Sequence, residues 1–227
     1  AVPFMVKAAK VYDQNLHDRE QAFAAAQIAF DEDVTNADAV KTLEQLTVQL
    51  GKWNDLLKAT MDAYNAEPAG PRKTQLGLHV ARWYGLELGH PEWAVPIYNQ
   101  ILTAEPTNLQ ALRALGELHR RGGQHQQLAK ILQRAVGAAT TSTERREQHL
   151  ALGEVYEKHL RSPEQAIEQF NAALAIKTDD TDALKALARV HQGSESWDEL
   201  VRVLRRTVEV TQDPAEVNEL RLKVGEI

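Results

Sequence analysis

The chain has 227 residues, a formal net charge of −6, 43% hydrophobic residues and only 6% aromatic residues. This composition is typical of a folded chain in water, and the acidic balance argues against the basic footprint of nucleic-acid binding. Cysteine is absent, which excludes disulfides, thiolate catalysis and cysteine-ligated metal. No apolar run approaches the roughly 18 residues of a membrane span, so we expect no membrane insertion.

A gapless internal repeat of 72 residues is the main signal in the sequence. It is seen in five sets of identical residues: Tyr12, Tyr84 and Tyr156; Ala22, Ala94 and Ala166; Ala39, Ala111 and Ala183; Leu43, Leu115 and Leu187; and Leu56, Leu128 and Leu200. Asn36, Asn108 and Asp180 recur in the same register before one helix. A repeat of this kind indicates stacked supersecondary units.

Each 72-residue unit divides into two predicted helix pairs, because apolar residues recur at helical spacing, as at Ala111, Leu112, Leu115 and Leu118. We predict about thirteen helices in a single array over 1–227. Its repeats span approximately 2–35, 36–69, 70–107, 108–141, 142–179 and 180–212, followed by a half repeat at 213–227.

Start and stop signals mark several of these helices. Ser162 and Asp213 each precede proline and an acidic residue, as helix caps do, and Ser196 with Glu199 forms a candidate capping box. Gly51 and the pair 122–123 are expected to end one helix and begin its partner.

The apolar pattern resembles the tetratricopeptide repeat. In 146–178, Leu152, Gly153, Tyr156, Ala166, Phe170 and Ala173 match that family's positions, as does Gly116 in 109–140. The repeats alternate between about 34 and about 38 residues, whereas the family has 34. The resemblance implies an all-α, right-handed superhelical solenoid of antiparallel helix pairs, with about six repeats and one extra helix.

The chain is expected to be a piece of a longer bacterial repeat protein. Ala1 is not an initiator methionine, and residues 221–227 still have a helical pattern. Neither a signal peptide nor cysteine is present, so we expect a cytoplasmic location unless a targeting signal lies in the missing part.

Catalytic motifs are absent, so the sequence predicts a protein that is not an enzyme and holds no cofactor or metal. The closest histidine pair, His119 and His125, has no further ligands nearby for a zinc site. Trp53 and Trp197 occupy a position that the repeat family fills with a packed aromatic residue. Trp83 and Trp93 flank a turn, and one of them could be exposed as a binding hot spot.

In this family the first helix of each pair lines the concave face, where partners bind. The residues that we predict for partner binding there are Lys41, Leu78, Arg82, Arg113, Glu117, Arg120, Arg121, Glu154, Glu157, Lys185 and Arg189. Arg82, Arg113, Arg120 and Arg121 could form a basic patch beside an acidic rib of Glu147, Glu154 and Glu157. The two ribs either pair with each other or form a charged groove that fixes the register of a bound peptide.

The leading functional hypothesis is a scaffold that binds a protein or peptide partner inside a larger complex. An exposed apolar patch around Leu78, Leu86 and Val48 would distinguish it. The alternatives are a structural spacer that self-associates end to end, and a regulatory domain of a larger protein. RNA binding is disfavoured by the acidic charge.

Overall fold

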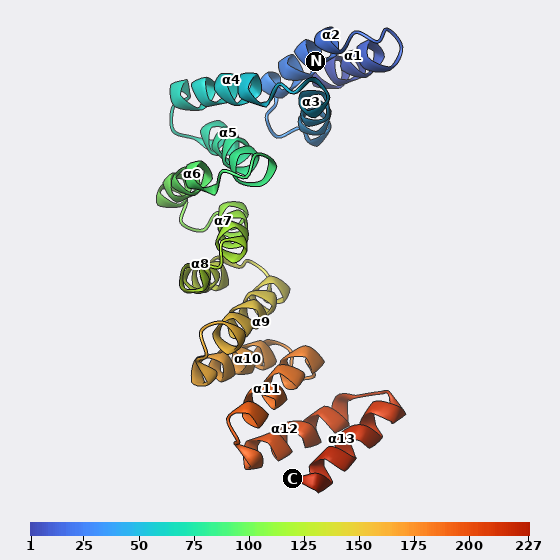
Figure 1. The fold of residues 1–227 in the computed structure, drawn as a ribbon, viewed down its shortest axis with the longest axis vertical. Coiled ribbons are helices and arrows are strands. Elements are labelled where there is room, and N and C mark those ends of the chain that lie inside the picture. The colour runs from blue at the N-terminus through green and yellow to red at the C-terminus, as the bar shows by residue number, and fades with distance from the viewer. The chain divides into compact units, whose positions relative to one another are not determined.

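The computed structural model describes residues 1–227, and its regular elements are all helical (Figure 1). Thirteen α-helices and one π-helical segment confirm the predicted all-α class and number of helices. In chain order they are α1 (Val2–Gln14), α2 (Arg19–Glu32), α3 (Ala37–Leu50), α4 (Trp53–Ala66), α5 (Pro71–Arg82), η1 (Trp83–Glu87), α6 (Pro91–Ala104), α7 (Leu109–Arg121), α8 (His125–Ala138), α9 (Ser142–Lys158), α10 (Pro163–Ile176), α11 (Thr181–Gly193), α12 (Trp197–Val210) and α13 (Pro214–Glu226).

The chain divides into two compact units, Ala1–Ile101 and Leu102–Ile227, which we call the N-terminal and C-terminal units. Within each unit, consecutive helices pack side by side, as α1 does with α2 and α9 with α10. Their connections are short, and short connections make neighbouring helices antiparallel. The predicted continuous array over both units stays a prediction.

The 72-residue repeat is present in the backbone dihedral angles as well as in the side chains. Six residues with positive φ fall at two repeat positions, each in the turn between the helices of a pair: His17 (55°), Gly89 (70°) and Arg161 (50°), and Gly51 (66°), Gly123 (66°) and Glu195 (55°). Left-handed backbone costs a residue with a Cβ roughly 1–2 kcal/mol, which explains glycine at three of these turns. The predicted helix stops at Gly51 and 122–123 are confirmed.

The alternating repeat length arises in the first helix of each pair. That helix has 17 residues in α9 but 13 in α7 and α11. At the end of the long helices the last turn widens: the Leu88 amide donates to the Trp83 carbonyl (3.0 Å) and the Leu160 amide to the Val155 carbonyl (3.1 Å). Bonds between residues five apart are those of a π-helix, which is the form that η1 takes.

Small residues at recurring positions let the helices approach closely. Ala22, Ala94 and Ala166 are each 0% exposed. A Cβ on Gly153 would lie 2.5 Å from the Cε1 atom of Phe170, so only glycine fits between α9 and α10 at this point. The close approach predicted at these alanines and at Gly153 is confirmed.

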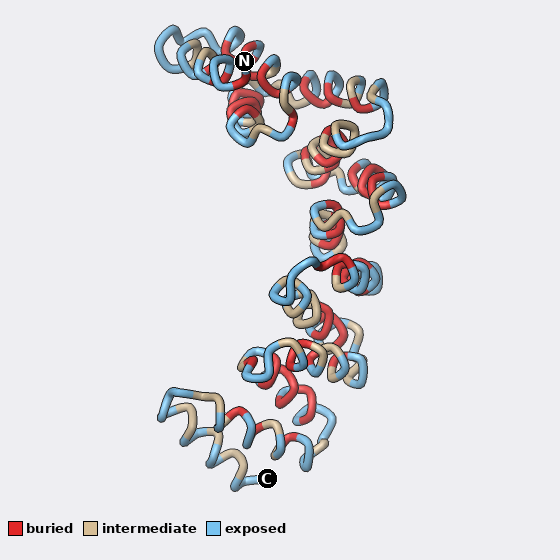
Figure 2. The backbone as a smooth tube through the Cα atoms, turned by 180° about the vertical axis from the view of Figure 1, so that it is seen from behind, coloured by how far each residue is buried: buried red, intermediate tan, exposed pale blue.

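The core of the C-terminal unit is built from α8 to α11, and Figure 2 shows buried segments on each of these helices, alternating with exposed ones. Leu128, Leu152, Phe170, Leu184 and Leu187 are each at most 2% exposed. Burying a side chain of this size stabilises a fold by about 1.5–3 kcal/mol, so this cluster holds the four helices together.

Helix caps follow the sequence signals in part. Asn36, Asn108 and Asp180 each accept a hydrogen bond from the amide three residues on, at 3.0, 3.0 and 3.3 Å, and thereby satisfy donors that the helix start leaves unpaired. The predicted cap Asp213 accepts from the second amide that follows it, at 3.0 Å.

The serine caps are a correction to the sequence prediction. Ser162 and Ser196 begin α10 and α12, but neither side chain makes a capping hydrogen bond. The Ser162 hydroxyl donates instead to the Leu160 carbonyl at 3.2 Å. The complete capping box lies at Thr141 and Glu144, which sequence reasoning missed.

Tryptophan burial differs from the prediction at one position. Trp83 is 0% exposed and Trp93 is 52% exposed, which confirms that one of these two reaches solvent. Trp53 is half-buried against Trp83, with ring centroids 6.1 Å apart. The prediction that Trp197 is packed is wrong, because it is 48% exposed. Two repeat periods after Trp83 stands Ile227, so α13 offers no ring against which Trp197 could pack.

Candidate partner-binding surface

The predicted binding residues lie on the first helices of their pairs. Lys41 is on α3, and Leu78 and Arg82 are on α5, all in the N-terminal unit. The C-terminal unit holds the others: Arg113, Glu117, Arg120 and Arg121 on α7, Glu154 and Glu157 on α9, and Lys185 and Arg189 on α11.

In the N-terminal unit, Arg82 is part of a half-buried polar cluster. It forms an ion pair with Glu44 of α3, which also accepts a hydrogen bond from the Trp83 indole at 2.7 Å. Beside them the His79 ring stacks on Trp83 and donates through Nε2 to the Val34 carbonyl at 2.7 Å. Burial lowers the pKa of His79, so its ring is neutral at pH 7. The charge of Arg82 is therefore balanced by Glu44, and its place in a basic patch with α7 stays a prediction.

The exposed apolar patch that would distinguish a scaffold of this kind is not found around Leu78. Leu78 is only 3% exposed because it packs into the core. Leu86 is half-buried, whereas Val48 is 62% exposed and Lys41 is also exposed. These residues do not form a continuous apolar surface.

In the C-terminal unit, ion pairs join successive first helices. They link Arg113 of α7 to Glu144 of α9 (3.1 Å), Glu157 of α9 to Arg189 of α11 (2.6 Å), and Lys185 of α11 to Glu216 of α13 (2.8 Å). The hydrogen bond to Glu216 raises the pKa of Lys185, and the hydrogen bond to Glu157 raises that of Arg189. The three ion pairs form a ladder along the first helices of this unit.

Two further groups of ion pairs lie within single helices. Glu117 accepts hydrogen bonds from Arg121 at 2.8 Å and Arg120 at 3.0 Å, which lower its pKa. Glu154 lies 3.4 Å from Lys158. The arginines of α7 thus pair with Glu117 and Glu144 rather than with the acidic rib predicted from the sequence. Exposed pairs of this kind contribute about 0–1 kcal/mol each.

A hollow of about 320 Å³ opens between α9, α10 and α11, and we call it the α9–α11 hollow. Its apolar lining is Leu150, Phe170 and Ala186, and its charged lining is Glu154, Asp182, Lys185 and Arg189. Three of the predicted binding residues, Glu154, Lys185 and Arg189, meet here. Sequence reasoning missed the apolar lining, although Leu150 lies one helical turn before Glu154 and so shares its face.

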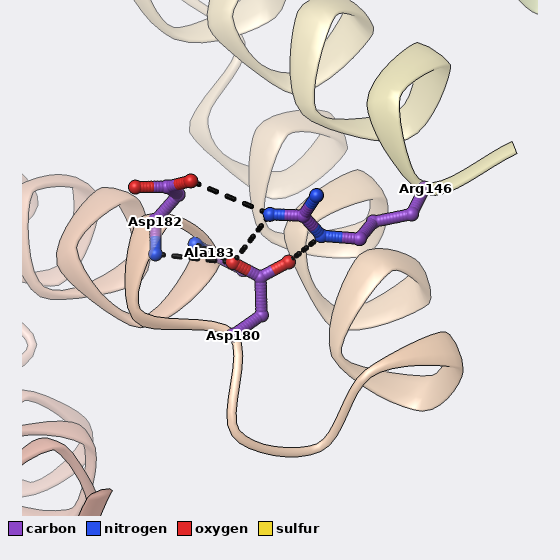
Figure 3. A network of polar contacts seen from close by, with 4 residues as sticks. All are labelled: Arg146, Asp180, Asp182 and Ala183. Carbon is purple, nitrogen blue, oxygen red and sulfur yellow. Dashed lines mark hydrogen bonds and ion pairs between the residues drawn. The ribbon is translucent and has the colours of Figure 1, made fainter. Parts of the chain in front are cut away.

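A buried ion pair fixes α9 to the start of α11 beside this hollow (Figure 3). Asp180 is 1% exposed and receives two hydrogen bonds from the guanidinium group of Arg146, whose Nη2 lies 2.9 Å from Oδ1. The same Nη2 donates to Asp182 at 3.3 Å. Burial favours the neutral acid, yet the bonds from Arg146 and from the amides of Ala183 and Asp182 outweigh it and hold the pKa of Asp180 below its usual value. The network therefore places Asp182 at the rim of the hollow.

The histidines weighed as zinc ligands have other partners. The Nδ1 atom of His119 lies 2.6 Å from the side-chain oxygen of Gln124. The ring of His125 stacks on the ring of His159, with centroids 3.8 Å apart. No group of three or more His, Asp or Glu side chains is placed to hold a metal ion. None of the helices combines the length and the apolar character that a membrane crossing requires.

Two family models match the chain. One describes the fifth ARM-repeat domain of TT21 and matches residues 89–192, and the other describes the tetratricopeptide repeat and matches residues 183–217. No curated protein matches the chain by sequence.

Solved structures show the same fold. One crystal structure of MamA has a TM-score of 0.53 and 19% identity, and the match covers 95% of this chain and 94% of that one. A second MamA structure has a TM-score of 0.52 and 19% identity, with 80% of this chain and 95% of that one covered. A tetratricopeptide repeat protein from Parabacteroides merdae has a TM-score of 0.50 and 16% identity, with 99% and 86% covered.

The fold, the 72-residue repeat and the helix pairs define an all-helical repeat protein. The tetratricopeptide repeat model matches the segment 183–217, and the solved structures share the all-helical repeat fold of the chain, which confirms the fold class that its sequence predicts.

Proposed function

We propose that this protein is a non-catalytic scaffold that binds a polypeptide segment of a partner on the first helices of its C-terminal unit, within a larger complex. Proteins with tetratricopeptide repeats typically act in protein–protein interaction. The observation that carries the proposal is the α9–α11 hollow, which combines an apolar floor with charged walls on the face predicted for binding.

The chemistry of this hollow suits a peptide. The half-buried Leu150 offers apolar surface to an inserted side chain, next to the buried side chains of Phe170 and Ala186. Lys185 and Arg189 are about half exposed in their ion pairs. An acidic group of a bound segment can therefore replace Glu216 or Glu157 as the ion-pair partner with little loss of free energy. Charges of both signs around an apolar floor favour one register of the bound chain.

Site-specific photo-crosslinking tests the proposal. A photo-reactive residue at Asp182, whose side chain is 75% exposed, is compared with one at the exposed Glu209 on α12 in extracts of the source organism. We expect capture of a defined polypeptide from position 182 only, and its loss in the double variant Lys185→Glu/Arg189→Glu. Equal capture from both positions, or capture unchanged by the charge reversal, would refute the proposal.

End-to-end self-association is a second candidate, favoured by apolar side chains exposed at both ends of the array. Phe4 of α1 is 80% exposed and Leu222 of α13 is 69% exposed. Light scattering over a concentration series tests it: a mass that rises with concentration supports assembly, and a constant monomer mass excludes it. A cytoplasmic location and a regulatory role within a larger protein also stay proposals.

A further inference from the structure

The N-terminal unit has a second hollow, of about 480 Å³, which is lined mainly by second helices of the pairs, whereas the α9–α11 hollow is lined mainly by first helices. It lies between α4, the turn after η1 and α6, so the second helices of two pairs form most of it. Its lining is Asn54, Leu57, Lys58, Met61, Asp62, Tyr84, Leu88, His90 and Trp93. We call it the Trp93 hollow.

Trp93 is exposed but held in one orientation. Its ring stacks on His90, with centroids 4.2 Å apart and planes at 21°, and meets Tyr84 edge to face at 5.3 Å. His90 is fixed in turn by a 2.9 Å contact between its Nδ1 and the Glu92 carboxylate. A tryptophan that is 52% exposed and already ordered loses little conformational entropy on binding, which is the property of an interface hot spot.

The aromatic wall is not a general property of the repeat. One period before and one period after Trp93 stand Gln21 and Gln165. Tyr84, which contacts Trp93, recurs one period later as Tyr156. The residue nine positions after Tyr156 is Gln165, whereas the residue nine positions after Tyr84 is Trp93. The exposed ring therefore belongs to this one turn of the array.

The corresponding side chains of the C-terminal unit make hydrogen bonds that the N-terminal unit lacks. There Gln133 stands one period after Met61, and its amide donates to the Tyr156 hydroxyl at 2.9 Å. Arg134 stands one period after Asp62 and donates to the Leu102 carbonyl. Met61 has no donor for such a bond to Tyr84.

The charges at the rim indicate which ligand fits. Lys58 and Asp62, one helical turn apart on α4, line the hollow and form no ion pair, in contrast to the paired ladder of the C-terminal unit. One ammonium and one carboxylate at the rim have no net charge, so together they favour neither a cation nor an anion inside the hollow. A neutral, apolar group inside, with an acid and a base beside it, complements all of these side chains.

We propose that the Trp93 hollow is a second partner-binding site, which receives one large apolar side chain of a partner polypeptide whose flanking residues include an acid for Lys58 and a base for Asp62. Leu57, Met61 and Leu88 form the floor under that side chain, and Trp93 forms its wall. This site does not depend on the α9–α11 hollow, and either can fail alone.

Selection of random short peptides displayed on phage, with the full chain as bait, tests this proposal. The variants Trp93→Gln and Met61→Gln introduce residues that the chain itself carries at the equivalent positions, so the fold tolerates them. Trp197→Gln removes the other exposed tryptophan and serves as the matched control.

We expect selected peptides to share one aromatic or long aliphatic residue between charged ones. Trp93→Gln should weaken their binding about 30-fold, as loss of a hot spot does, and Trp197→Gln should leave it unchanged. The proposal is overturned if no peptide is enriched, if Trp93→Gln binds as the parent does, or if the peptides carry only basic residues. Peptides sensitive to Lys185→Glu/Arg189→Glu but not to Trp93→Gln support the α9–α11 hollow alone.

Discussion

Replacing Asp180 with asparagine removes a buried charge but leaves the helix cap in place. Asn36 and Asn108 occupy the same repeat position, and both cap their helices with hydrogen bonds of 3.0 Å. Asp180→Asn therefore keeps the start of α11 intact. It isolates the contribution of the ion pair with Arg146, which fixes α9 to α11.

The magnitude follows from the bonds that change. Arg146 donates two hydrogen bonds to Asp180. Hydrogen bonds to charged groups contribute about 1.5–3 kcal/mol each, and a neutral asparagine oxygen retains about 1 kcal/mol of this. The side chain of Arg146 is 19% exposed and keeps its contact with Asp182, which lessens the loss further. We expect Asp180→Asn to lower the free energy of unfolding by about 2 kcal/mol at pH 7.

The loss of unfolding free energy in Asp180→Asn should be larger at neutral pH than in acid. The pKa of Asp180 is lowered in the folded protein, so its contribution is fully present above the unfolded value near 3.9 and is lost as pH falls through the folded value. The difference between parent and variant should therefore narrow below about pH 4. Urea unfolding followed by circular dichroism measures it, and hydrogen exchange of the α11 amides locates it, because repeat arrays open unit by unit.

Asp182→Asn is the control, because this side chain is 75% exposed and its contact with Arg146 is long, at 3.3 Å. It should cost less than about 0.5 kcal/mol. A cost of Asp180→Asn no greater than that of Asp182→Asn, or a cost that is the same at pH 7 and in acid, would show that the ion pair with Arg146 does not stabilise the fold as described.

Three further predictions concern the fold. Gly153→Ala should lower the free energy of unfolding by about 1–3 kcal/mol, because its Cβ would meet the Phe170 ring at 2.5 Å. Gly116→Ala, where the nearest atom is 3.5 Å away, should raise it by up to about 1 kcal/mol, and equal effects in urea unfolding would contradict both. Glu195→Gly should raise the melting temperature, because φ is 55° there and glycine relieves about 1 kcal/mol of strain; a lower melting temperature would contradict this. Burial lowers the pKa of His79, so His79 of the unfolded chain binds a proton at higher pH than His79 of the folded chain, and the free energy of unfolding falls as pH drops below about 6.5. His79→Gln should lessen this fall when urea unfolding is measured as a function of pH, and an unchanged pH profile would contradict it.

The repeat made most of the fold predictable from sequence. Residues that recur every 72 positions, such as Ala22, Ala94 and Ala166, have the same environment in each copy, so a helix pair identified once applies to all. The recurrence of Asn36 and Asn108 before one helix was visible for the same reason, and the structure shows that both cap that helix. Local spacing alone also indicates the contacts of Glu117, because its arginines lie three and four residues away.

Contacts between helices were not predictable in the same way. Arg113 pairs with Glu144 and Arg189 with Glu157, at separations of 31 and 32 residues. These separations depend on the register with which one first helix packs on the next, and periodicity within a helix does not fix that register. Of the two arrangements that the sequence left open, pairing of the α7 arginines with the acidic rib is not found, and the register explains why: they pair with Glu117 and Glu144 instead.

Exposure of individual aromatic residues also depends on the neighbouring repeat. Trp53 and Trp197 share a repeat position, but only Trp53 has a tryptophan of the next pair beside it. Leu78 matched a position of the concave face, yet it is buried in the N-terminal unit. Repeat position thus predicts the helix face of a residue better than its contact with solvent.

Partner recognition at the α9–α11 hollow is measured by isothermal titration calorimetry, which gives the affinity of the polypeptide captured at position 182 for the parent and for Lys185→Glu/Arg189→Glu. Both side chains are about half exposed, so the variant keeps the fold. We predict at least about tenfold weaker binding to the variant, because replacing Lys185 and Arg189 by glutamate leaves only acidic side chains in the charged lining of the α9–α11 hollow, and these repel the acidic groups of a bound segment. An affinity equal to that of the parent would contradict partner recognition at this hollow.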